Sequence, residues 1–382
     1  MRLAFLSIGR HIHTERWIQW FAARGHDCHL LTVQPGEVEG VTVHDITAAG
    51  PGKPVRYWRS LQQVKSILAD LQPDLLNTHF LTGYGYWGDW SGFRPNLLTV
   101  WGDDIYVTPF ENPLKGWLAR RALAHCDALT GDSVDVLKVA SEQLGADAQR
   151  AYRVLWGVDH EIFRPLDATE YRARLGFGPE HVVYFSPRSY TQPYYNIDTV
   201  IEAAAQVHRQ EPMARFLFAG YEGDPAPFEA LVAGAGLADV ARVVGRIPHH
   251  EFATALNAGD VFISVPSVDA TAVSLLEAMS CGRAIIVSSL ASAMEWVRDG
   301  ENGRVVAPRS ADQLASAMLD YAREPGVRRA HGEAAREVAL AEAGFDANMA
   351  HVDAIVRSLT GGGDAWPQVV SLPFLDGGGD AS

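Results

Sequence analysis

One stretch of the chain, residues 261–287, reads VFISVPSVDATAVSLLEAMSCGRAIIV and determines the fold class. Residues 261–265 form a short apolar run, which is typical of a buried strand. The apolar spacing of residues 273–279 predicts a helix, and residues 284–287 form a second apolar run. A strand, a helix and another strand in quick succession predict a parallel pair joined by a crossover helix.

The same alternation of short apolar runs and amphipathic segments continues in both directions and starts again after Pro165. We expect strands at residues 3–8, 28–33, 74–78, 96–100, 128–130, 181–185, 215–219 and 241–244. We expect helices at residues 15–24, 57–71, 114–125, 133–144, 197–208, 228–235, 251–257, 311–322 and 327–341. The pattern therefore predicts an α/β protein with two doubly wound, Rossmann-like parallel-sheet domains that face a cleft.

We place the first domain at residues 1–163 and the second at residues 164–344. A last helix, residues 345–360, is expected to cross back to the first domain. Residues 361–382 contain two triple-glycine runs, so we expect a loose tail.

Composition and charge exclude several classes of protein. The 382 residues suffice for two domains, and 47% hydrophobic with 20% charged residues is ordinary for a globular chain. The net charge of −14 argues against a nucleic-acid partner. Cys28, Cys126 and Cys281 form no CxxC pattern, so neither a disulfide framework nor a cysteine zinc site is expected, and a cytoplasmic location is favoured. No apolar stretch of about 20 residues occurs, so no membrane span is expected.

Two carboxylates frame the start of the helix in residues 261–287. Asp269 precedes this helix and Glu277 lies eight residues later, up to roughly 12 Å along a helix axis. The spacing suits a sugar plus a diphosphate, with Asp269 on sugar hydroxyls and Glu277 on the two ribose hydroxyls. Backbone N–H groups suited to the diphosphate lie between them, at Thr271, Ala272, Val273 and Ser274. The alternative is an N-cap aspartate and a solvated helix glutamate.

This segment resembles the E-x7-E motif of family 4 glycosyltransferases, with Asp269 in place of the first glutamate. Residues 281–287 (CGRAIIV), 299–303 (DGENG) and 156–165 (WGVDHEIFRP) are similar to further parts of that family's pattern. The resemblance extends to about residue 360. It implies the GT-B fold, a nucleotide-sugar donor, transfer with retention of the anomeric configuration, and neither a metal nor a cofactor.

The resemblance also implies a cation site after the strand at residues 181–185. Arg188 matches the family's arginine on the donor diphosphate, but the lysine expected a few residues later is absent. Tyr194 or Tyr195 stands in its place, so Arg188 would carry most of the diphosphate charge, helped by a tyrosine hydroxyl. The alternative is a surface or salt-bridged arginine.

The remaining candidates follow strand ends in both domains. The resemblance implies that His79 reaches the transferring sugar, that Gly9 lies in a phosphate-binding loop, and that Arg246 and Ile247 lie against the nucleobase. His13, beside the expected N-cap Thr14, is a candidate for acceptor binding. Asp103 and Asp104 suit a hydroxylated or amino acceptor, or are a solvated loop pair. Residues 84–90 are rich in aromatic residues, which favours packing.

We therefore expect a metal-independent, retaining glycosyltransferase of glycan or glycoconjugate synthesis, with His79, Arg188 and Asp269 in catalytic roles. Its acceptor is a hydroxylated small molecule, a lipid-linked molecule or a glycan, and contact with the inner face of the membrane stays open. One alternative is another GT-B enzyme, either a nucleotide-sugar epimerase or a phosphorylase. The other is a non-catalytic sugar-nucleotide-binding protein. A dinucleotide dehydrogenase is disfavoured because no G-x-G-x-x-G follows an expected strand.

Overall fold

The computed structural model describes residues 1–220 and 224–361, which fall into two compact units. Of the described residues, the first unit contains Met1–Trp156 and residues 346–361, and the second contains the described part of Gly157–Phe345. The first unit thus ends a few residues before the predicted boundary at residue 163. The reason is local: Val158 N–H donates to Ala343 O and Phe345 N–H donates to Val158 O, which ties these residues to the second unit.

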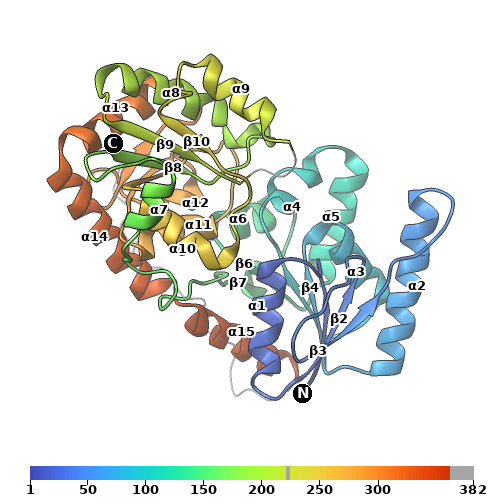
Figure 1. Cartoon of the computed structure of the whole chain (residues 1–382). Coiled ribbons are helices and arrows are strands. Elements are labelled where there is room, and N and C mark those ends of the chain that lie inside the picture. Colours follow the sequence, from blue (N-terminus) through green and yellow to red (C-terminus); the bar gives the residue numbers. More distant parts are fainter. Residues whose placement is uncertain (221–223, 362–382) are drawn as a thin grey trace, which may run out of the picture. The chain divides into compact units, whose positions relative to one another are not determined.

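The first unit contains a seven-stranded parallel sheet in the order β3-β2-β1-β4-β5-β6-β7 (Figure 1). Its strands are β1 (Arg2–Leu6), β2 (Asp27–Thr32), β3 (Val41–Asp45), β4 (Leu75–His79), β5 (Asn96–Thr99), β6 (Ala128–Gly131) and β7 (Ala151–Arg153). Its helices are α1 (Ile12–Ala22), α2 (Lys53–Leu71), α3 (Tyr86–Ser91), α4 (Asp103–Tyr106), α5 (Pro113–His125), α6 (Val134–Glu142) and α15 (Phe345–Leu359). The strand order reverses between β1 and β4, which is where ligands bind in such sheets.

The second unit contains a six-stranded parallel sheet in the order β10-β9-β8-β11-β12-β13. Its strands are β8 (Val182–Ser186), β9 (Ala214–Phe218), β10 (Ala241–Val243), β11 (Val261–Ser264), β12 (Ala284–Ser288) and β13 (Arg304–Val306). Its helices are α7 (Thr169–Arg174), α8 (Ile197–Gln210), α9 (Ala226–Gly234), α10 (His249–Ala258), α11 (Val273–Ser280), α12 (Ala291–Met294), α13 (Ala311–Arg323) and α14 (Pro325–Glu342). Here the order reverses between β8 and β11.

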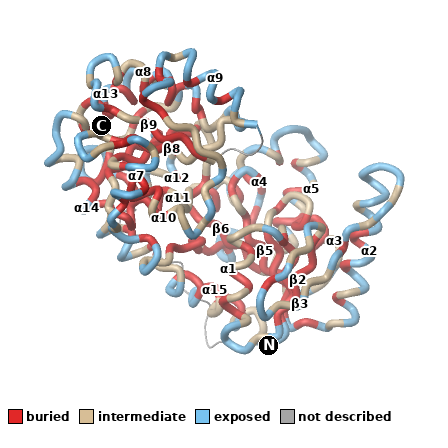
Figure 2. Tube along the Cα trace, in the orientation of Figure 1, coloured by how far each residue is buried: buried red, intermediate tan, exposed pale blue. Residues whose placement is uncertain are grey.

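The inner strands of both sheets are buried on their two faces, and much of their trace is red in Figure 2, whereas the edge strand β3 is partly exposed. In the first unit, Phe5 of β1 contacts Phe21 of α1, while Ala4 and Leu6 pack with Leu61 of α2. Successive residues of a strand point to opposite faces, so α1 and α2 cover opposite faces of this sheet. Parallel strands covered in this way read as continuous apolar runs, which explains why the sequence reveals them.

Helix α15 belongs to the first unit, although the chain reaches it only after completing the second. Asp346 accepts a hydrogen bond from Trp20 Nε1 of α1 at 2.7 Å, and Asn348 Oδ1 accepts one from the Leu155 N–H at 3.0 Å. The predicted tail, residues 361–382, lies outside the described residues except for Gly361. None of the described helices is long and apolar enough to cross a membrane.

Candidate functional site

Arg188 and Asp269 meet at the carboxyl ends of the two central strands of the second unit. Arg188 follows β8 and Asp269 follows β11, and these strands are neighbours at the point where the strand order reverses. Arg188 Nη2 donates to Asp269 Oδ2 at 2.6 Å, and its Nε donates to Ser264 Oγ at 2.9 Å. The fold thus brings together two of the predicted site residues, which are 81 positions apart in sequence.

Both side chains of this pair are mostly shielded from solvent. The side chains of Arg188 and Asp269 are only 12% and 22% exposed. Burial raises the pKa of Asp269, and the nearby guanidinium only partly offsets this effect. Burial opposes the charge of Arg188 and is the largest single effect, but Asp269 and Tyr195 together more than compensate and the pKa of Arg188 is raised. The Tyr195 ring centroid lies 4.9 Å from Arg188 Cζ, so the predicted tyrosine accompanies the arginine.

Hydrogen bonds hold the loops that carry these groups. Asn196, buried and left-handed with φ of +53°, donates from Nδ2 to Val265 O at 2.9 Å and to Ser267 Oγ at 2.8 Å. The Ser267 N–H donates to Tyr194 O at 2.7 Å. On the other side, Ser292 Oγ donates to the carbonyl oxygen of Asp269 at 2.8 Å. The loops after β8 and β11 are therefore one connected scaffold.

Replacing Asn196 by alanine should destabilise this scaffold by about 2–4 kcal/mol, because the buried Val265 O and the half-buried Ser267 Oγ lose their donor and alanine disfavours the left-handed backbone. Denaturant unfolding measures the change. Asn196→Gly is the matched control, because glycine removes the side chain but keeps the backbone unstrained. An alanine variant as stable as the wild type would show that these bonds do not support the loops.

The segment between the two acids has the predicted form, and both alternative roles of the acids are excluded. The N-cap of α11 is Ala272, not Asp269. Glu277 is 5% exposed, so it is no solvated helix residue, and its Oε1 lies 3.9 Å from His249 Nε2. Thr271 is buried beside Trp296, and Val273 and Ser274 form the first turn. The N–H groups of a first turn have no partner within the helix, so they suit an anion.

Arg246 and Ile247 lie in the connection between the edge strand β10 and α10. Arg246 is exposed and Ile247 is half-buried. His249 begins α10, and its ring packs against Phe163 with centroids 5.5 Å apart. The structure thus places His249, which we had not predicted as a site residue, beside Glu277.

In the first unit, His79 at the end of β4 is enclosed. Its ring lies 5.2 Å from Trp17, 5.8 Å from Trp156 and 6.3 Å from Trp101, between ring centroids, and it is 0% exposed. Burial lowers the pKa of His79 to about 3, so the ring is neutral. This enclosure conflicts with the prediction that His79 reaches a sugar, because tryptophans from three separate segments cover it.

The hydrogen bonds of His79 define its tautomer. Trp17 Nε1 donates to Asn77 Oδ1 at 3.0 Å, and His79 Nε2 lies 3.0 Å from the same oxygen. Because an amide oxygen only accepts, Nε2 carries the hydrogen and Nδ1 carries a lone pair. That Nδ1 is buried without a hydrogen-bond partner among the described residues. His79 therefore helps to position the tryptophans around it.

The more accessible groups at this edge of the sheet are His11, His13 and Trp101, which are all half-buried. His13 stacks on Trp156 with ring centroids 5.0 Å apart, and His11 meets Trp101 edge-on at 4.7 Å. His11 is the N-cap of α1, so the predicted cap Thr14 is wrong. We define His11, His13 and Trp101 as the aromatic collar, because their half-buried rings can pack on the flat face of a sugar.

Gly9 and Asp104 have structural roles that conflict with their predicted contacts. The Gly9 N–H donates to Thr32 Oγ1 at 2.9 Å, and a Cβ atom on Gly9 would lie 2.3 Å from Gln34 O. Close packing therefore explains this glycine better than a phosphate. Asp104 is 0% exposed and accepts N–H bonds from Leu81, Trp101 and Gly102 at 2.6–2.9 Å. Of the predicted acceptor carboxylates, only that of Asp103 is exposed.

Two family models match most of the chain. Residues 2–133 match the model described as glycosyl transferase 4-like, and residues 167–338 match glycosyl transferases group 1. The chain belongs to the family 4 glycosyltransferases.

The D-inositol 3-phosphate glycosyltransferase of Geodermatophilus obscurus is 30% identical over 209 residues, which are 52% of this chain and 46% of that protein. That of Mycobacterium tuberculosis is 31% identical over 215 residues, 54% and 43% of the two chains. The chain spans about half the length of the curated relatives it matches.

Solved structures share the fold of this family 4 glycosyltransferase over nearly its whole length. Sucrose-phosphate synthase from Thermosynechococcus elongatus is 18% identical with a TM-score of 0.80, over 94% of this chain and 99% of the other. HepE of Anabaena, in a complex with UDP-glucose, is 15% identical with a TM-score of 0.81, over 94% and 100%. These likenesses confirm the predicted GT-B fold.

Sequence reasoning missed several residues of this family 4 glycosyltransferase that support its predicted site. Ser264 could have been noticed, because it is a polar residue that ends the apolar strand β11, directly before the loop that carries Asp269. Asn77 is likewise a polar residue in a strand that begins with apolar residues, and it lies in the middle of β4. Trp17 and Trp156 give no such signal, because apolar residues at their positions also read as ordinary core.

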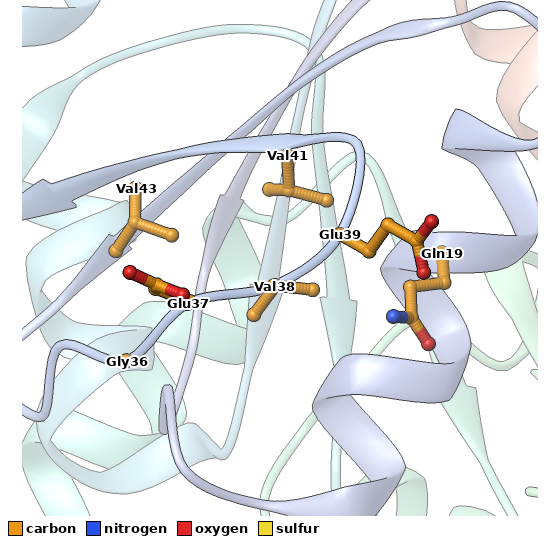
Figure 3. A pocket seen from close by; sticks show the side chains of 7 residues that line it. All are labelled: Gln19, Gly36, Glu37, Val38, Glu39, Val41 and Val43. Atoms are coloured by element: carbon orange, nitrogen blue, oxygen red, sulfur yellow. The ribbon is translucent and has the colours of Figure 1, made fainter.

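A surface pocket of the first unit lies apart from the predicted residues. It is lined by Gln19, Gly36, Glu37, Val38, Glu39, Val41 and Val43, from α1, the loop before β3, and β3 (Figure 3). The pocket has two carboxylates and one valine in the loop and two valines on the edge strand β3, so its lining offers no cation to a diphosphate. Among the described residues, no group of three or more His, Cys, Asp or Glu side chains is arranged to hold a metal ion.

The pH dependence of stability should contain a contribution from Asp104. Burial raises its pKa from 3.8 to about 6. The folded state therefore binds a proton more tightly than the unfolded state, and the stability from this group is lost as pH rises from about 4 to about 6. We expect the unfolding free energy of the wild type to fall relative to Asp104→Asn across that window and to run parallel above it. Denaturant titrations at several pH values measure the difference, and a constant difference from pH 4 to 7 would contradict the assignment.

Proposed function

We propose that this protein transfers a sugar from a nucleotide-sugar donor to a hydroxylated acceptor, with retention of configuration and without a metal ion. One observation carries the proposal: Arg188 and Asp269 are paired at the reversal point of the second sheet, at the start of the segment that leads to α11 and Glu277. Adjoining loops and one helix thus carry the three groups that the donor needs. Arg188 is the cation for the diphosphate, Asp269 is the carboxylate for the sugar hydroxyls, and Glu277 is the buried carboxylate for the ribose.

The proposed chemistry depends on positioning and on charge. Arg188 and the first-turn N–H groups of α11 would stabilise the negative charge that develops on the leaving diphosphate. Asp269 would orient the sugar through its hydroxyl groups. The leaving diphosphate would take the proton of the acceptor hydroxyl on the same face of the sugar, so that configuration is retained without a protein nucleophile.

The acceptor would bind to the first unit, with the aromatic collar and Asp103 as its contacts. Aromatic faces pack on the apolar faces of sugar or cyclitol rings, and an exposed carboxylate accepts hydrogen bonds from their hydroxyl groups. Since curated relatives are named D-inositol 3-phosphate glycosyltransferases, this compound is the first acceptor to test. UDP-glucose is the first donor, because the structurally similar HepE was solved with it.

A thermal-shift screen against UDP, GDP, ADP and CDP and their glucose conjugates tests the donor site. A ligand at about 100 times its Kd should add about 2.7 kcal/mol to the unfolding free energy. Donor consumption with and without acceptor then separates a transferase from an epimerase or a binding protein. Anomeric coupling constants of the product report retention or inversion, and an unchanged rate in EDTA would support metal independence. Binding without turnover by any acceptor would favour a binding protein.

We further propose that the protein works in the cytoplasm and contacts the inner face of the membrane through the start of α2. This end of the helix exposes Lys53, Val55, Arg56 and Trp58, with Trp58 59% exposed. Basic residues around an exposed tryptophan suit an anionic lipid surface.

Co-sedimentation with vesicles of phosphatidylglycerol and phosphatidylcholine should decrease in Trp58→Ser. Trp117→Ser, which changes a tryptophan of similar exposure on α5, is the control. Equal sedimentation of both variants and the wild type would contradict the contact.

A further inference from the structure

The cation proposed for the donor diphosphate is already engaged by a carboxylate of the chain. Asp269 Oδ2 lies 2.6 Å from Arg188 Nη2, and Ser264 Oγ takes the Nε hydrogen of the same guanidinium. The centroid of the Tyr195 ring lies 4.9 Å from Arg188 Cζ. Both charged side chains are mostly buried, so this pair is weakly screened by solvent.

A diphosphate and Asp269 need the same guanidinium. Both are anions, so placing them side by side on one cation costs repulsion unless a second cation shares the charge. The chain offers no lysine for that purpose in the second unit, because Lys53, Lys65, Lys115 and Lys138 all precede it. A diphosphate that reaches Arg188 therefore competes with Asp269.

We infer that Asp269 and the donor diphosphate exchange places on Arg188, so that Asp269 sets the preference for the complete sugar nucleotide over the bare nucleoside diphosphate. This inference rests on the proposed donor site. When a diphosphate displaces Asp269, the freed carboxylate is left without its cation in a largely buried position. A donor sugar supplies hydroxyl groups that donate to it, whereas the hydroxyl groups of a nucleoside diphosphate are those of its ribose, which the proposed site assigns to Glu277. Release of the nucleoside diphosphate product is thereby favoured.

The variant Asp269→Asn tests the exchange, since it removes the charge and keeps the size of the side chain. Isothermal titration with UDP, GDP, ADP and CDP measures the affinity of each diphosphate, and the four nucleosides serve as phosphate-free probes. The Kd of the diphosphate that binds should fall about five- to tenfold, as expected for release of a partly buried ion pair. The Kd of its nucleoside should stay unchanged, and donor turnover should fall.

Asp320→Asn is the matched control, because Asp320 pairs with Arg304 at 3.4 Å in the same unit but on α13 and β13. It should leave every affinity unchanged. A double-mutant cycle with Arg188→Gln separates exchange from simple repulsion: exchange requires that the gain in affinity from Asp269→Asn shrinks in the Arg188→Gln background.

Two results would overturn the exchange. One is a diphosphate affinity that is unchanged or weaker in Asp269→Asn, which would mean that Asp269 merely orients Arg188. The other is a gain of equal size in both backgrounds of the cycle. Failure of the proposed function looks different: none of the four diphosphates or nucleosides would bind to the wild type or to either single variant.

Discussion

Replacement of Arg188 by alanine should abolish sugar transfer, with a loss of roughly 10³-fold in the rate of donor consumption. The guanidinium is the cation that the second unit places at the reversal point of its sheet, and no lysine of that unit can replace it. Without it, the charge on the leaving diphosphate would depend on N–H groups and a tyrosine hydroxyl. Steady-state donor consumption measures the effect.

The alanine variant also leaves Asp269 without its partner, so a loss of folding must be distinguished from a loss of chemistry. Arg188→Lys is the control variant, since it keeps the charge beside Asp269 but removes the planar fork that binds phosphate bidentately. We expect it to fold like the wild type and to recover only part of the rate. If Arg188→Ala kept most of the wild-type rate, the diphosphate would have to be held by other groups.

Replacement of Glu277 by glutamine should weaken nucleotide binding by about 10- to 100-fold, which corresponds to the loss of one or two charge-assisted hydrogen bonds. Glu277 is 5% exposed and lies on α11, so its carboxylate is held in place by the helix. Titration with the nucleoside alone measures the effect, because the proposed contact is with the ribose.

The control for Glu277 is a comparison of ribose with deoxyribose. If the carboxylate accepts hydrogen bonds from the ribose hydroxyls, the wild type should prefer the ribonucleoside and Glu277→Gln should lose much of that preference. A variant that binds both nucleosides like the wild type would assign Glu277 a packing role beside His249. Glu277→Gln keeps the volume of the side chain, so a cavity does not complicate the comparison.

Much of the fold follows from short apolar runs, because strands buried on both faces need apolar residues at every position. The strands that we missed, β3, β7 and β13, are edge strands of their sheets. Their sequences, such as Arg304-Val305-Val306, are short and partly exposed. They are specified by pairing with a neighbour, which a local pattern does not contain.

The parts of the candidate site that lie close together in the sequence were predictable. Asp269 and Glu277 are eight residues apart on one continuous segment, so their spacing indicated a shared ligand. The pairing of Asp269 with Arg188 spans three βαβ units, from β8 to β11, and depends on which strands are neighbours. The enclosure of His79 depends on Trp17, Trp101 and Trp156, which come from three separate segments. Such tertiary contacts are not visible in any single stretch of sequence.

The confinement of all four lysines to the first unit has a practical result. Amine-directed reagents will label only that half of the molecule, whereas arginine-directed reagents such as phenylglyoxal will also reach the other half. A guanidinium also keeps its proton in alkali, where an ammonium group would lose it. Surface coupling through amines therefore offers a way to immobilise the protein without touching the chemistry of its second sheet.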